Sequence, residues 1–134
     1  MKKLQNNFTT PEQSKRLLEL GVPADSADCY HVARNNYTAI LHNELFTKCR
    51  DNIIRVSKTA YRAEMHDDDI LPCWSVGRLI EIALICATTA VKPYINFSTS
   101  EGWSAANNID YMMSIFVNYS STYMDFSKLE EGWL

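Results

Sequence analysis

The segment at residues 75–88 constrains the fold most, because apolar residues cover almost its whole surface when it is drawn as a helix. Its main stripe contains Val76, Leu79, Ile80, Ala83, Leu84 and Ala87, and Ile82, Ile85 and Cys86 widen it. Only Arg78 and Glu81 clearly face outward, as neighbours three positions apart. A helix that is apolar nearly all round is buried. The segment therefore predicts a central helix, with Ser75 as its N-cap, that the rest of the chain must cover.

The same apolar run is too short to cross a membrane. From Leu79 to Val91 it contains about thirteen residues, including Glu81, whereas a membrane-spanning helix needs about 20 apolar residues. Residues 1–7 include two lysines but no apolar stretch behind them, so they do not resemble a secretory signal. We therefore expect a cytoplasmic protein that does not enter the membrane.

Residues 11–20 carry the clearest local helix signal. Thr10 can cap the first turn, and Gln13 three positions later completes a capping box. Gly21 then stands where a left-handed C-cap belongs, and Pro23 prevents the helix from continuing. The pattern predicts a short helix that ends at residue 20.

The middle of the chain predicts a β-hairpin followed by mixed elements. Residues 29–33 and 37–41 are rich in strand-forming side chains, and the polar residues 34–36 between them indicate the turn. Residues 42–52 favour a short helix, because apolar residues recur there at every fourth position. Residues 53–65 fit either a helix or a strand, and the alternation of apolar and polar residues over 53–59 favours a strand there.

Two further elements are expected nearer the C-terminus. Residues 94–97 resemble a strand, and Ser104 is expected to cap a helix, before a polar tail at 125–134. The apolar stripe of that helix contains Ala105, Ile109, Met112, Met113 and Phe116. Together these elements predict an α+β fold with a small antiparallel sheet of about three or four strands and about three helices packed on it. Without an internal repeat or linker, residues 1–134 form a single domain.

The cysteines and glycines predict no cofactor. The four cysteines form no C-x-x-C pair and are expected to stay reduced, as small buried hydrophobes. They are Cys29, Cys49, Cys73 and Cys86. The four glycines are isolated, so the chain has no phosphate-binding loop, dinucleotide motif or nucleophile elbow.

A basic segment is the candidate nucleic-acid-binding site. It contains Lys48, Arg50, Arg55, Lys58 and Arg62. The first 66 residues hold ten basic and seven acidic side chains, and the remaining residues hold three and nine. This asymmetry suits a phosphate backbone or an acidic protein partner. The whole chain has a net charge of −3, however, whereas dedicated nucleic-acid-binding domains are strongly basic. Nucleic-acid binding is therefore the alternative, and an ordinary solvated face is favoured.

An acidic run supplies the candidate metal ligands. His66, Asp67, Asp68 and Asp69 offer an imidazole and carboxylate oxygens. Adjacent residues point in different directions, however, and the spacing of a calcium-binding loop is missing. A solvated acidic connection is the favoured interpretation, so we expect no metal site.

Cys73 is the candidate catalytic residue. It lies just before the central helix, where the helix dipole and the free N–H groups stabilise a thiolate. A nucleophilic cysteine also needs a neighbouring base, which the sequence does not place. A packed thiol is therefore the favoured interpretation, and a catalytic site near Cys73 or Asp67–Asp69 is an alternative.

Three blocks of the sequence resemble a family of small uncharacterised proteins of gut bacteria and their phages or prophages. The blocks are Phe8–Cys29, in its parts 8–14, 17–21 and 24–29, then Leu71–Ile82, and finally Asp125–Glu131. They cover about half of the chain. The family brings no known activity, cofactor or catalytic residue, so the resemblance implies only a mobile-element or accessory context.

These observations favour a non-enzymatic accessory or interaction protein. No nucleophile with its base, metal-ligand spacing or phosphate loop is recognisable, whereas the charge difference between the two halves suits association between proteins. The expected partner is another protein or a second copy of the chain.

Overall fold

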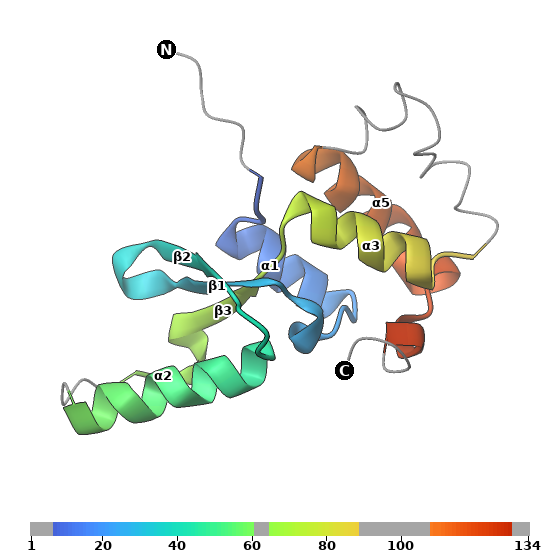
Figure 1. The fold of residues 1–134 in the computed structure, drawn as a ribbon. Helices are drawn as coiled ribbons and strands as arrows, with labels where there is room; N and C mark the ends of the chain where they lie inside the picture. The colour runs from blue at the N-terminus through green and yellow to red at the C-terminus, as the bar shows by residue number, and fades with distance from the viewer. Residues whose placement is uncertain (1–6, 61–64, 89–107, 130–134) are drawn as a thin grey trace, which may run out of the picture.

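The structure, a computed structural model, describes residues 7–60, 65–88 and 108–129 of the chain. It is an α+β fold, as expected, with a three-stranded antiparallel sheet in the order β2-β1-β3. The strands are β1 (Cys29–Val32), β2 (Tyr37–Ile40) and β3 (Ile70–Cys73), and the α-helices are α1 (Pro11–Glu19), α2 (Phe46–Ala60), α3 (Val76–Cys86) and α5 (Ile109–Tyr123). The sheet and α1 lie between the α3–α5 pair and the projecting helix α2 (Figure 1).

Helix α1 forms as its capping residues predict. The Gln13 backbone N–H donates to the Thr10 hydroxyl at 3.2 Å, and the Thr10 N–H donates to the Gln13 side chain at 2.9 Å. Gly21 follows the helix with a φ of +97°, a left-handed conformation that a glycine adopts without strain. The Val22 N–H then bonds to the Leu17 carbonyl and closes the helix end.

The predicted hairpin is also confirmed. Strands β1 and β2 pair in register from Cys29 opposite Ile40 to Val32 opposite Tyr37. A short 3-10 turn at Ala33–Asn35 connects them. It ends at Asn36, which has a left-handed φ of 50°, a conformation that asparagine tolerates better than most residues.

The strand predicted at 53–59 is wrong, and the helix predicted at 42–52 begins late. Both regions belong to the single helix α2, Phe46–Ala60. Phe46 and Cys49 are buried, and Ile53 is partly buried, so the inward face follows a helical spacing. The apolar alternation over 53–59 was too short to distinguish a strand from a helix.

Strand β3 was not predicted, because Pro72 interrupts its strand pattern. All four of its residues are buried, and it pairs antiparallel with β1. The strand tolerates the proline because β3 lies at a sheet edge, and residue 72 is one of the positions whose backbone points away from β1.

The helix pair α3–α5 confirms most of the two predicted apolar stripes. Leu84 and Ile85 of α3 are an exception, because they are 46% and 36% exposed, so α3 is not buried on every side as its sequence predicted. Helix α3 lies within the expected 75–88, and the Ser75 hydroxyl accepts the Arg78 N–H at 3.1 Å as its N-cap. The cap of α5 is Asn108, not Ser104, because the Asn108 side chain accepts two N–H groups of the first turn. Its stripe residues Ile109, Met112, Met113 and Phe116 are all buried. Ser104, Ala105 and the strand expected at 94–97 lie outside the described residues.

Part of the expected polar tail is folded against the core. A 3-10 helix at Phe126–Leu129 packs on α3 and buries Leu129. The Phe126 ring stacks on Phe116, with ring centroids 6.4 Å apart. Phe126 and Leu129 therefore hold this segment against the core, although most of its other residues are polar.

Helix α3 is fastened to the sheet by hydrogen bonds at the β3–α3 junction, Trp74–Ser75. Asp28 accepts the Ser75 backbone N–H at 2.9 Å and also the Ser75 hydroxyl. The Trp74 side chain is fully buried, and its indole N–H donates to the Ser26 hydroxyl at 3.0 Å. The backbone of Thr9 pairs with the same junction, because its N–H donates to the Trp74 carbonyl. The junction therefore connects the N-terminal segment, β1 and α3.

We predict that Asp28→Ala lowers the free energy of unfolding by about 2 kcal/mol, because it leaves the two Ser75 donors without their charged acceptor. The matched control is Asp51→Ala, since Asp51 is an exposed residue whose ion pair with Arg50 should contribute little. Urea unfolding of the three proteins measures the difference. Equal stabilities for both variants would contradict this role of Asp28.

Candidate functional site

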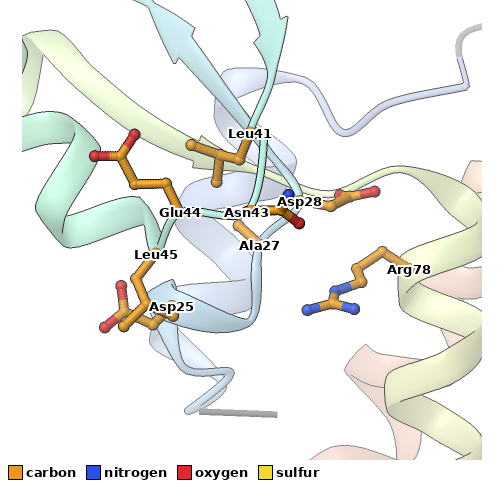
Figure 2. A pocket seen from close by; sticks show the side chains of 8 residues that line it. All are labelled: Asp25, Ala27, Asp28, Leu41, Asn43, Glu44, Leu45 and Arg78. Carbon is orange, nitrogen blue, oxygen red and sulfur yellow. The ribbon is translucent and has the colours of Figure 1, made fainter.

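An open cleft of about 490 Å³ lies between the segment that precedes β1, the loop that precedes α2, and the start of α3. Figure 2 shows its lining residues, Asp25, Ala27, Asp28, Leu41, Asn43, Glu44, Leu45 and Arg78. Three of these side chains are acidic, and Arg78 faces them across the cleft (Figure 2). This composition is typical of a polar binding site. Whether the charged groups are free to bind a ligand depends on the hydrogen bonds that they already make within the protein.

The charged groups of the cleft already hold the fold together. Asp25 accepts the Thr47 backbone N–H at 2.8 Å and the Thr47 hydroxyl at 3.0 Å, which anchors the start of α2. Asp28 anchors the start of α3 in the same way, as described above. The Arg78 Nε–H donates to the Ser26 carbonyl at 2.8 Å. These groups therefore act as structural acceptors and donors.

A second groove, of about 370 Å³, lies along β2. Its lining residues are Phe8, Tyr37, Thr38, Ala39, Ile40 and His42. Tyr37 is 51% exposed and Ile40 is 57% exposed, the two most exposed large apolar side chains of the described residues. β2 is an edge of the sheet, so no strand among the described residues pairs with its other side.

The hydrogen-bonding direction of β2 follows from one backbone hydrogen bond. The Leu41 N–H donates to the Asp28 carbonyl at 2.9 Å, across the β1–β2 pair. Hydrogen-bonded and non-hydrogen-bonded positions alternate along an antiparallel pair, so Ala39 also bonds to β1. Thr38 and Ile40 therefore direct their backbone N–H and C=O groups toward the open side. Such an edge is a template for another strand.

The structure divides the predicted basic segment. Lys48 and Arg55 are seven positions apart on α2, so they lie on one solvent-exposed face, and Lys58 is exposed nearby. Asp51 is exposed between the first two. Arg62 lies outside the described residues.

Arg50 faces the protein and does not join this surface. Its guanidinium carbon lies 5.5 Å from the centroid of the Phe46 ring, in the geometry of a cation–π contact. Its Nε lies 3.9 Å from a carboxylate oxygen of Asp67. The segment thus presents fewer cations together than its sequence suggested.

Two of the four candidate metal ligands, Asp67 and Asp69, have carboxylates that already pair with protein groups. Asp69 accepts the His66 backbone N–H at 2.8 Å and lies 3.6 Å from the Arg34 guanidinium. Asp67 pairs with Arg50, and Asp67–Asp69 form a short 3-10 turn. Within residues 7–60, 65–88 and 108–129, no group of three His, Cys, Asp or Glu side chains converges as a metal site requires.

Cys73 is buried beside another thiol. It lies directly opposite Cys29 in the β1–β3 pair, and each side chain is only 1% exposed. The Cys73 thiol donates to the Thr9 carbonyl at 3.4 Å, and the Thr9 hydroxyl lies 3.7 Å from the same sulfur. The described partners of Cys73 are therefore a hydroxyl, a carbonyl and a thiol, and it lines neither groove.

Two features of the site were missed by sequence reasoning. The open edge of β2 could not be recognised, because it depends on the order of the strands in the sheet. The pairing of Cys29 with Cys73 required strand β3, which the sequence pattern did not indicate.

Comparisons with protein-family models, curated proteins and solved structures give no match for this chain. In the described residues, no helix is both long enough and apolar enough to cross a membrane.

We predict that the melting temperature is unchanged by EDTA and by added Zn²⁺, Mg²⁺ or Ca²⁺, because Asp67 and Asp69 already pair with arginines. Differential scanning fluorimetry measures this directly. A rise in Tm with one metal that disappears in the Asp69→Asn variant, but not in Asp110→Asn, would instead establish a site at residues 66–69.

Proposed function

We propose that the protein is a non-enzymatic accessory or interaction protein of phage or prophage origin. It acts in the cytoplasm, and it associates with a second copy of itself through the edge of its sheet. The observation that carries the proposal is the edge strand β2, whose backbone groups at Thr38 and Ile40 face outward beside an apolar groove. Sheet continuation supplies main-chain hydrogen bonds for affinity and side-chain contacts for specificity.

The geometry of β2 favours a second copy as its partner. Thr38 and Ile40 are placed symmetrically about Ala39, so a two-fold axis through Ala39 brings Thr38 of one copy opposite Ile40 of the other. Each such pair exchanges two backbone hydrogen bonds, and the axis generates the pair twice. The contact is therefore isologous, with the same patch used by both copies.

The side chains of β2 do not oppose this pairing. Its sequence, Tyr37–Ile40, contains no charge and no proline, whereas protected sheet edges commonly carry lysine or proline. β-branched Thr38 would lie beside Ile40 of the other copy, a cross-strand contact that favours sheets. A four-residue strand buries little area, so we expect a weak, concentration-dependent dimer.

We predict that Ile40→Lys abolishes self-association, because it places a charge at the pairing edge on both copies. The control is Val56→Lys, which introduces the same charge at an exposed apolar residue of α2. Sedimentation equilibrium over a wide concentration range should show the mass of wild type and of Val56→Lys rise above 15.4 kDa toward two chains. Ile40→Lys should remain at the mass of one chain.

Two results would contradict the proposal. One is a wild-type protein that keeps the mass of a single chain at the highest concentration reached. The other is an Ile40→Lys variant that associates as strongly as wild type, which would place the contact elsewhere. Because Ile40 is mostly exposed, the substitution should leave the folded chain intact, and circular dichroism checks this.

A further inference from the structure

Cys29 and Cys73 face one another across two strands and have no disulfide between them. Asp28, just before β1, and Tyr30, within β1, direct their backbone hydrogen bonds toward β2. Because the direction alternates along a strand, Cys29 directs its backbone bonds toward β3, so Cys29 and Cys73 form a hydrogen-bonded pair. The Cα atoms of such a pair lie about 5.5 Å apart. Disulfides span Cα separations of roughly 4.4–6.8 Å, so the strands need no large movement to accept one.

The two thiols are chemically different. The Cys29 sulfur lies 3.6 Å from the Asp28 carboxylate, and the pKa of Cys29 is raised by its hydrogen bond to Cys73, by burial and by this negative charge. The pKa of Cys73 is lowered by the hydrogen bond that it receives from Cys29, with a further contribution from Thr9, although burial opposes this. Cys73 is thus the better thiolate of the pair, and Cys29 is positioned to resolve an oxidised Cys73.

We propose that Cys29 and Cys73 are a redox modification site, which a peroxide converts to an intramolecular disulfide. The Cys73 thiolate attacks one peroxide oxygen, the O–O bond breaks, and hydroxide leaves and takes up a proton to become water. The Cys73 sulfenic acid then reacts with the Cys29 thiol: the S–S bond forms, the S–O bond breaks, and the second water leaves with the Cys29 proton. Both sulfurs are oxidised, and the peroxide is reduced to two waters. This inference does not depend on the pairing of β2.

Access to the buried pair requires the segment Asn7–Thr9 to move. Thr9 covers the Cys73 sulfur through its carbonyl and hydroxyl, and two backbone bonds hold the segment, Thr9 to Trp74 and Val76 to Asn7. Such a short extended segment opens more easily than the core beneath it. Oxidation is therefore expected to be slower than that of an exposed thiol and to proceed from the folded protein.

The experiment is treatment of the folded, reduced protein with hydrogen peroxide, followed by blocking of free thiols and peptide mapping by mass spectrometry. We expect a loss of the mass of two hydrogens, a single cross-link between the Cys29 and Cys73 peptides, and full reversal by dithiothreitol. Cys49 and Cys86 are the internal controls, because both are buried and free but have no cysteine opposite them in a strand pair. They should remain thiols.

Matched variants separate the site from general thiol chemistry. Cys73→Ser and Cys29→Ser should each abolish the cross-link, whereas Cys49→Ser and Cys86→Ser should retain it. A wild-type protein that gains oxygen atoms without the cross-link, or that links Cys49 or Cys86, would overturn the proposal. Since the decisive mapping uses the wild-type chain, a variant that fails to fold does not affect the test.

Discussion

The rest of the fold depends on the hydrogen bonds at the β3–α3 junction. Trp74 brings a large apolar ring and one indole N–H into the core, and an unpaired buried N–H would cost about 1–3 kcal/mol. Ser26 supplies the acceptor, and Asp28 accepts both donors of Ser75. These bonds join residues 47 or 48 positions apart, so they close the chain on itself at the point where the sheet meets the buried helix.

This arrangement leaves β2 as the least supported part of the sheet. β1 and β3 are tied to the junction directly, whereas the hydrogen bonds of β2 in the described residues reach it through β1 and the bond from Leu41 to Asp28. An edge with outward-facing backbone groups and exposed apolar side chains suits association more than catalysis. The acidic cleft has the opposite character, because its charged groups are already used to anchor α2 and α3. The proposed association surface is therefore separate from the polar bonds that stabilise the fold.

The predictability of each element follows from where its signal lies. α1, the hairpin and α3 were predicted because caps, turns and apolar stripes are local, as at Thr10, Gly21 and Ser75. The single helix α2 was missed because the few alternating residues at 53–59 fit both the two-residue repeat of a strand and the 3.6-residue repeat of a helix. Strand β3 contains Pro72, and only its place at a sheet edge makes that residue acceptable. Cys73 was noticed from its position before a helix, but its partner Cys29 and the open edge of β2 depend on the strand order, which a local pattern does not encode.

Native-state hydrogen exchange in dilute solution tests the central claim, that the junction is the last part of the fold to open. The account predicts that the amides of Ser75 and Arg78, which donate to Asp28 and to the Ser75 hydroxyl, exchange only through global unfolding, with protection that matches the full free energy measured with urea. The amides in the C-terminal half of α2 should exchange much faster, because that half projects from the core. Junction amides that exchange as fast as those of α2 would contradict the account.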